Sequence, residues 1–253
     1  MNEMTPQNNT ERTSTASSKP KKQLPWIVET LLIVVVVLAV VGIFQAFVGR
    51  QYVIPSGSME PTLHGCQGCT NDRVFVQKLS YYNSEPKPGD VIVFEGTEDW
   101  NDMWESPRSP NPTVAKIQEA LSKVSLAPPN ENNLVKRVIA TGGQEVSCQE
   151  GDEAVMVDGK PIKQDYVLDP PTYAINPKTG SEACGGDYFG PVTVPEDHLF
   201  MMGDSRTNSR DSRAHLEDGL NGSIPLENVR GKVELVFFPF NNFGKVEAPG
   251  IQQ

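Results

Sequence analysis

The feature that most constrains this chain is an uninterrupted apolar segment near its N-terminus. Leu31–Phe44 holds fourteen residues without a polar side chain, and the apolar stretch extends from Ile27 to Val48. As a helix rising about 1.5 Å per residue, this stretch would cover roughly 33 Å, enough to cross a hydrocarbon core of about 30 Å. Trp26 stands where tryptophan is typical of a membrane interface. We therefore expect a transmembrane helix over residues 26–48.

A cleavable signal peptide is the alternative to a permanent span, because the apolar core of a signal peptide can reach about 15 residues. However, the stretch Gln45-Ala46-Phe47-Val48-Gly49 offers no small-x-small cleavage motif. A permanent single span is therefore favoured.

The charge distribution predicts how the span is oriented. Residues before it carry a net charge of +2, and the whole chain carries −10, so with Glu29 inside the span the remainder carries −11. The positive-inside rule then places the N-terminus in the cytoplasm and residues 49–253 outside. We expect residues 1–25 to form a disordered cytoplasmic tail, since they are polar and have little to bury. An acidic chain also disfavours a role in nucleic-acid binding, which needs basic patches.

All four cysteines follow the span and would occupy a compartment that permits disulfides. A zinc site would need two close cysteine pairs, and only Cys66 and Cys69 are close in sequence. Structural disulfides are therefore favoured over a metal site or free thiols. Proximity suggests pairing Cys66 with Cys69 and Cys148 with Cys184.

The portion after the span has the pattern of a mainly β domain over residues 49–253, with a β-rich subdomain over 144–200. Short β-branched or apolar runs alternate with Gly, Pro, Asn and Asp. Asp158-Gly159 is a hairpin turn signal, and Pro88-Gly89-Asp90 is a turn that leads into a strand. The runs predicted as strands are Val74–Val76, Val91–Phe94, Val135–Ile139, Ala154–Val157, Val192–Val194, Leu199–Met202 and Val233–Phe238.

Residues 95–133 interrupt this β pattern and are predicted to be an insertion with one short amphipathic helix. Val114, Ile117, Leu121 and Val124 have helical spacing, with a start at Asn111-Pro112 and a stop at Pro128-Pro129. The insertion also holds Trp100 and Trp104 among acidic residues. These tryptophans could dock on lipid or pack under the loop, and packing is favoured because anionic lipid would repel the acidic neighbours.

Ser58 is the first candidate catalytic residue, in Ser56-Gly57-Ser58 just outside the span. Taken alone, a serine between prolines is most often part of a surface turn. A nucleophilic serine needs a base for its proton and donors for the oxyanion that forms. Ser56 could supply one donor, since Gly57 lets the backbone turn tightly enough to bring its hydroxyl near the Ser58 amide.

Lys136 is the candidate base, in an alternating apolar strand where Leu134, Lys136 and Val138 share one face. A lysine on such a strand is normally a solvated edge residue. Burial would instead penalise its charged form and lower its pKa, so that it could act as a neutral general base.

A third polar cluster runs from Met201 to Arg213, where such residues usually form a loop that bonds to itself. Within it, Asp211 and Arg213 could pair in a salt bridge, and Ser209 could orient an amine.

With these clusters in this order after a single span, the chain resembles the bacterial type I signal peptidases, membrane-bound Ser/Lys endopeptidases that remove secretory signal peptides. The resemblance rests on Ile54–Leu63, Gly89–Phe94, Val135–Ile139 and Gly203–Arg213, about a quarter of the chain. It implies a signal-peptidase-like catalytic domain, secretory precursors that carry signal peptides as substrates, a lipid bilayer as partner, and no metal or organic cofactor.

The resemblance also implies a role for each matching residue. Ser58 matches the nucleophile and Lys136 the general base, while the Ser56 hydroxyl and the Ser58 amide match the oxyanion hole. Ser209 matches the residue that positions the lysine, and Asp211 and Arg213 match the pair that supports the site. Asp204 and Arg206 belong to the same box with structural roles. Met59 matches an apolar residue that shapes the substrate pocket, and we expect Ile54 and Val135 to narrow that pocket to alanine-sized side chains.

The match has departures. Ser205 and Thr207 replace the usual Asn and Asp, and Ala140–Gln144 is a loose version of the motif that normally follows the lysine strand. These changes bear on local loop structure.

Three other interpretations compete with this one. Gly203-Asp204-Ser205 resembles the nucleophile turn of trypsin-like proteases, with His64 as base, but Arg206-Thr207 follow where that turn needs glycine. The chain could also be a membrane-tethered binding or scaffold module without chemistry. A self-cleaving repressor shares Ser/Lys chemistry but would need a DNA-binding head where this chain has a span.

Overall fold

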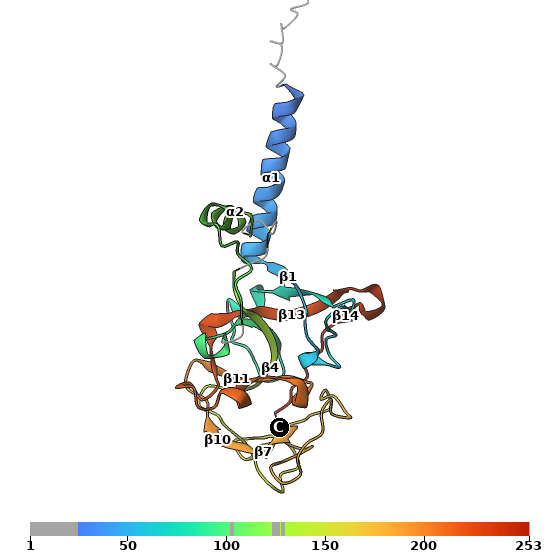
Figure 1. The fold of residues 1–253 in the computed structure, drawn as a ribbon, viewed down its shortest axis with the longest axis vertical. Helices are drawn as coiled ribbons and strands as arrows, with labels where there is room; N and C mark the ends of the chain where they lie inside the picture. Colours follow the sequence, from blue (N-terminus) through green and yellow to red (C-terminus); the bar gives the residue numbers. More distant parts are fainter. Residues whose placement is uncertain (1–24, 102–103, 123–126, 128–129, 253) are drawn as a thin grey trace, which may run out of the picture. The chain divides into compact units, whose positions relative to one another are not determined.

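The computed structural model describes residues 25–101, 104–122, 127 and 130–252, and its chain is drawn in Figure 1. It divides into two compact units, Met1–Leu38 and Ala39–Gln253. The tail expected over residues 1–25 lies outside the described residues, apart from Pro25.

The long helix α1 spans Trp26–Phe47, in agreement with the apolar stretch in the sequence. It is long and apolar enough to cross a membrane, and none of its residues is buried against protein. A core helix of a soluble domain would bury one face. The helix is therefore not part of the protein core.

The larger unit is built on an antiparallel sheet, which has eight strands within the described residues. Their order is β1-β2-β13-β3-β4-β11-β12, with β14 paired to β13. The mainly β fold expected from the sequence is confirmed. The strands are β1 (Gly49–Val53), β2 (Arg73–Gln77), β3 (Val91–Glu95), β4 (Asn133–Thr141), β11 (His198–Met202), β12 (Ile224–Pro225), β13 (Val229–Phe238) and β14 (Gly244–Lys245).

A second sheet, in the order β10-β5-β6-β7, comes from the region predicted as a β-rich subdomain. Asp158 and Gly159 join β6 to β7 with φ of 52° and 72°, the positive values that the predicted hairpin turn requires. Two disulfides form, one between Cys148, at the end of β5, and Cys184, and the other between Cys66 and Cys69. This is the pairing expected from proximity. The strands are β5 (Glu145–Cys148), β6 (Met156–Val157), β7 (Lys160–Pro161) and β10 (Phe189–Thr193), with a separate pair β8 (Gly180–Ser181) and β9 (Gly186–Asp187).

The residues between β3 and β4 carry the short helix α2, Pro112–Ser122. Asn111 starts it, because its side-chain oxygen accepts from the amides of Thr113 (3.0 Å) and Val114 (3.4 Å). The predicted helix start is therefore confirmed, whereas Val124 and the predicted stop at Pro128-Pro129 lie outside the described residues.

Trp100, from the same segment, is buried in the core. Its ring meets Phe94 edge-on, with centroids 5.5 Å apart, and stacks on His215 at 4.6 Å. Packing under the loop is thus the correct interpretation for Trp100, and Trp104 is half-buried. Short 3₁₀ turns complete the described structure: η1 (Gly57–Met59), η2 (Leu79–Tyr81), η3 (Glu98–Trp100), η4 (Arg206–Asn208), η5 (Ser212–His215), η6 (Leu226–Asn228) and η7 (Phe240–Asn242).

Candidate active site

Ser58 lies on the 3₁₀ turn η1, which follows β1 after three residues. Ile54, Met59 and Leu63 are all buried in the same apolar cluster and fix this segment on the sheet. Ser56 and Ser58 lie between Ile54 and Met59, and neither is buried, so their hydroxyls remain accessible at the surface of the turn. The Ser56 hydroxyl donates to Ser58 Oγ at 3.4 Å. Apolar burial on both sides therefore holds two serine hydroxyls next to each other.

Lys136 reaches this turn from β4. Its side chain is 5% exposed, and its Nζ lies 2.7 Å from Ser58 Oγ. Burial lowers the pKa of Lys136 to about 8, although the carboxylates of Asp211 and Asp204 act in the opposite direction. The lysine is therefore not a solvated edge residue, and an appreciable fraction is neutral near pH 7.

Two strands have free edges beside the pair: β4, which carries Lys136, and β1, which precedes the turn with Ser58. Among the described residues β1 pairs only with β2, and β11 pairs with β4 only from Arg137 onward. One edge of residues 133–136 is therefore unpaired. A cavity of about 60 Å³ lies between these two segments. It is lined by Tyr52–Ser56, Ser58, Met59 and Asn133–Lys136.

This cavity places the expected substrate-binding residues together. Ile54 and Met59 are 2% and 1% exposed, and Val135 is half-buried against the same cluster. All three line the cavity beside Ser58 and Lys136.

The polar loop after β11 packs against the turn η1 that carries Ser58. The Ser205 amide donates to the Ser58 carbonyl at 3.2 Å, and a Cβ on Gly203 would overlap that same carbonyl oxygen. Glycine is thus required for the close approach. The Gly203 amide in turn donates to Asp211 Oδ2 at 3.0 Å. The loop is therefore locked directly onto the backbone of Ser58.

Asp211 and Arg213 form the salt bridge expected from the sequence. Arg213 donates from Nε and Nη2 to the two carboxylate oxygens, at 2.9 and 2.8 Å. Burial would raise the pKa of Asp211, but Arg213 and the Gly203 amide hold it below its ordinary value. Asp211 is therefore a fixed negative charge close to Lys136.

Ser209 does not make the contact expected of it. Its Oγ is buried and has no hydrogen-bond partner among the described residues, so it does not bond to Lys136. It does lie beside the site, because a Cβ on Gly203 would overlap Ser209 Oγ. The arrangement brings Ser209 near Ser58 without the predicted link to the amine.

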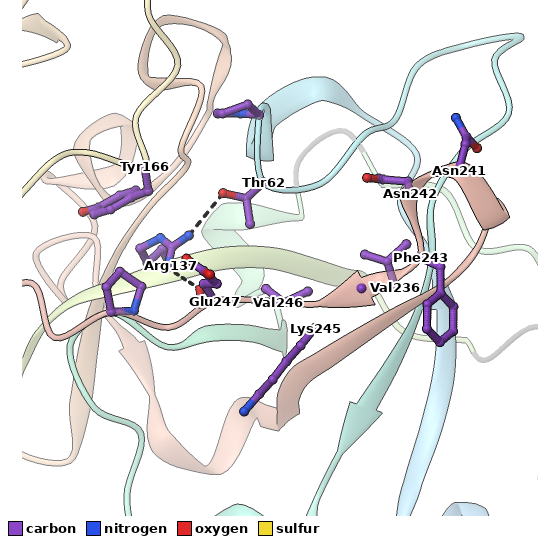
Figure 2. Close-up of a pocket in the computed structure, with 13 residues that line it drawn as sticks. Thr62, Arg137, Tyr166, Val236, Asn241, Asn242, Phe243, Lys245, Val246 and Glu247 are labelled. Atoms are coloured by element: carbon purple, nitrogen blue, oxygen red, sulfur yellow. Dashed lines mark hydrogen bonds between the residues drawn. The ribbon is translucent and has the colours of Figure 1, made fainter.

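Arg137 and Asp204 form a buried ion pair that sequence analysis did not predict. Arg137 is 1% exposed, and its Nε and Nη2 donate to Asp204 at 2.9 and 2.7 Å. Thr62, four residues after Ser58, donates to the same carboxylate at 2.6 Å. Figure 2 shows Arg137 reaching Thr62 and Glu247 in a cavity of about 400 Å³. The sequence held one sign of this pair, because Arg137 directly follows Lys136 and therefore lies on the opposite face of the strand, where a buried arginine needs an acidic partner.

The larger cavity in Figure 2 lacks a nucleophile-and-base pair. Its one buried cation, Arg137, donates to Asp204, to Thr62 and to the carbonyl oxygens of Gly89 and Glu247. The small cavity beside Ser58 is therefore the candidate active site.

The sequence matches the family described as "Signal peptidase, peptidase S26" over residues 27–238. This chain belongs to that family. A signal peptidase I from Mycobacterium tuberculosis is 46% identical over 230 residues, which cover 89% of this chain and 77% of that protein. Signal peptidase I T from Bacillus subtilis is 31% identical, over 94% of this chain and 97% of that protein. A crystal structure of a signal peptidase I from Enterococcus faecalis V583 matches at 21% identity, covering 59% of this chain and 97% of that chain, with a TM-score of 0.32.

In this member of the signal peptidase family, Ser205 and His64 do not form the nucleophile-and-base pair of the trypsin-like interpretation. Ser205 is 1% exposed, and its hydroxyl bonds to Thr172 at 2.9 Å. His64, its proposed base, pairs with Glu60. That interpretation is therefore wrong.

Among the described residues, one group of three side chains could in principle hold a metal, namely His64, Cys66 and Cys69. The two sulfurs of this group are joined in a disulfide. A disulfide sulfur is not a thiolate and cannot act as the usual cysteine ligand.

Proposed function

We propose that Ser58 and Lys136 are the catalytic dyad of a type I signal peptidase, a membrane-anchored serine endopeptidase that removes N-terminal signal peptides from secretory precursors. The observation that carries the proposal is the 2.7 Å contact between Ser58 Oγ and a buried Lys136 amine whose pKa is lowered to about 8. A neutral amine at hydrogen-bond distance from a hydroxyl is the arrangement that a general base requires.

The reaction is acyl transfer. Neutral Lys136 takes the Ser58 proton as Ser58 Oγ attacks the scissile carbonyl carbon. The carbonyl oxygen becomes an oxyanion, which the Ser58 amide and the Ser56 hydroxyl stabilise. Collapse breaks the C–N bond, and the protonated Lys136 gives its proton to the leaving amine. Lys136 then removes a proton from water, which attacks the acyl-enzyme and releases the acid with Ser58 restored.

The free strand edges support a substrate bound in extended form. Residues 133–136 of β4 and the end of β1 face the same cavity, and each has backbone groups that no neighbouring strand of the described structure takes. A peptide can therefore add to these edges through backbone hydrogen bonds. In this arrangement the scissile bond lies between Ser58 and Lys136.

The size of the cavity supports cleavage after small side chains. At about 60 Å³ it is much smaller than the cavity of about 400 Å³ beside Arg137, which favours small side chains. Ile54, Met59 and Val135 form its apolar wall. We assign to these three residues the selection of small-x-small sequences.

The anchor and its orientation complete the proposal. α1 crosses the cell membrane once, residues before it stay in the cytoplasm, and residues 49–253 form an extracytoplasmic catalytic domain. The net charges of +2 before the span and −11 after it support this orientation, and so do the two disulfides after the span. Ser58 follows the end of α1 by only eleven residues, which suits a bond cut close to the lipid surface.

In vitro cleavage of one secretory precursor, with N-terminal sequencing of the product, tests the dyad. We expect Ser58→Ala and Lys136→Ala each to abolish processing while the variants still fold. Ser84→Ala and Lys160→Ala, at exposed positions outside the candidate site, are matched controls and should cleave normally. Cleavage by either dyad variant, or full activity of Lys136→Arg, would overturn the assignment. Reporter fusions at the two ends of the chain test the orientation.

A further inference from the structure

Helix α2 exposes the apolar side of its surface. Val114, Ile117 and Leu121 are 42%, 55% and 37% exposed. Their spacing of three and four residues places them in one stripe along the helix. We call this set the α2 stripe. An exposed apolar stripe of this kind marks a surface that another apolar phase covers.

The side of α2 that packs on the protein is polar or small instead. Ala115, Gln118 and Ser122 are its half-buried residues. Gln118 accepts from the Ser109 amide at 2.8 Å, and the Ser122 hydroxyl accepts from Arg108 at 3.1 Å. At about 100° per residue, this side is turned roughly a quarter of a circle from the α2 stripe. A helix on a water-exposed surface normally packs its apolar face inward, so α2 has the reverse arrangement.

The C-terminal end of α2 is tied to the residues that follow α1. The Ser122 carbonyl accepts from Arg50 Nη2 at 3.1 Å, and Arg50 is the third residue after Phe47, the last of α1. The end of α1 is fixed in the same place, since Tyr82 donates to the Phe47 carbonyl at 2.9 Å and Lys78 to that of Ala46 at 3.3 Å. If α1 crosses a bilayer, the lipid surface lies at this level of the structure.

Charged side chains gather on the other side of α2 from the α2 stripe. A cavity of about 710 Å³ is lined by Arg50, Arg108 and Lys116, together with Glu119 and Glu131. Its three cations outnumber its two carboxylates. A helix with an apolar stripe on one side and charged side chains on the opposite side is typical of a segment that lies in a membrane interface.

We propose that α2 lies on the outer surface of the bilayer, with the α2 stripe at the boundary between headgroups and acyl chains. The charged side of α2, with Lys116 and Glu119, then faces away from the acyl chains. The inference rests on the proposed membrane anchoring by α1. It gives the catalytic domain a second attachment to the lipid, which restrains its rotation and keeps Ser58 at a constant height above the surface.

Site-directed fluorescence on the full chain in vesicles tests the proposal. Because all native cysteines form disulfides, Ile117→Cys provides a single free thiol for an environment-sensitive label. Glu119→Cys, nearly opposite the α2 stripe on the same helix, is the matched control, and Val40→Cys in α1 reports the anchor. The vesicles are of phosphatidylcholine, with and without phosphatidylglycerol, and carry a nitroxide quencher on the acyl chains.

We expect the label at position 117 to be quenched several-fold more than the label at 119, with quenching at 40 in every vesicle. Quenching at 40 but equally weak quenching at 117 and 119 would overturn the inference and leave the anchor intact. Loss of quenching at 40 would overturn both. Burial of the label at 117 that grows with protein density and not with lipid would mean that a second protein chain covers the stripe, and would also overturn the inference.

Discussion

Replacing Lys136 with methionine is expected to stabilise the fold at pH 7 while removing activity. Burial lowers the pKa of Lys136 from 10.5 to about 8, so the folded state penalises the ammonium form. At about 1.4 kcal/mol per pH unit, this difference corresponds to about 3 kcal/mol. The lost hydrogen bond to Ser58 offsets about 1 kcal/mol, and methionine fills a similar volume. The variant should therefore be about 2 kcal/mol more stable than the wild type.

The pH dependence of this difference identifies its cause. Below pH 8 the lysine is protonated in both the folded and the unfolded state, so the penalty is fully present. Between pH 8 and 10.5 the folded state releases its proton first, and wild-type stability rises relative to the variant. Above pH 10.5 the penalty is gone, and the variant should be less stable by about 1 kcal/mol.

Urea unfolding of the full chain in detergent, followed by tryptophan fluorescence at about pH 7 and about pH 11, measures both differences. Lys160→Met, at an exposed position, is the matched control and should change stability little at either pH. A Lys136→Met variant that is less stable than the wild type by the same amount at both pH values would refute a low pKa for this amine.

Three further outcomes are expected. The rate of peptide cleavage should rise with pH through about 8, the pKa of Lys136, and then level off; a rise only near the ordinary lysine value would contradict a buried base. Replacing Cys148 and Cys184 together with serine should cost about 4 kcal/mol in urea unfolding, because their bridge closes a loop over a sequence separation of 36. The Gly203→Ala variant should be about 1–3 kcal/mol less stable than the wild type and should lose most of the wild-type kcat, because the added methyl group would overlap the Ser58 carbonyl oxygen. An active variant of wild-type stability would show that the loop can move aside.

Local signals predicted much of the fold. The apolar stretch gives α1 at Trp26–Phe47, and the Asn111-Pro112 start gives α2. Both depend on neighbouring residues alone, through length, apolar composition and capping. The strand runs succeeded for the same reason, although the runs did not include β1, β5, β12, β14 or the short pair β8 and β9. Most of these strands are only two residues long or contain glycine and polar residues, so their apolar content gives little sign of them.

The candidate site was predictable only in part. Alternation along β4 correctly placed Lys136 and Arg137 on opposite faces, and the resemblance brought Lys136 to Ser58. The partner of Arg137 could not be found in this way, since Asp204 lies 67 residues later and only the pairing of β4 with β11 brings the two together. Ser209 lacks its expected bond because the direction of a hydroxyl depends on side-chain packing, which a motif does not describe.

The adjacent positions of Lys136 and Arg137 make activity sensitive to the alignment of β4 with its neighbours. A shift of one residue in one direction would put Arg137 in the place of Lys136. Ser58 would then meet a guanidinium, which keeps its proton at any pH that the protein tolerates. Such a misaligned chain could still be compact and inserted, yet it could not start the reaction. Titration of refolded samples with a serine-directed acylating agent would therefore count the correctly aligned molecules.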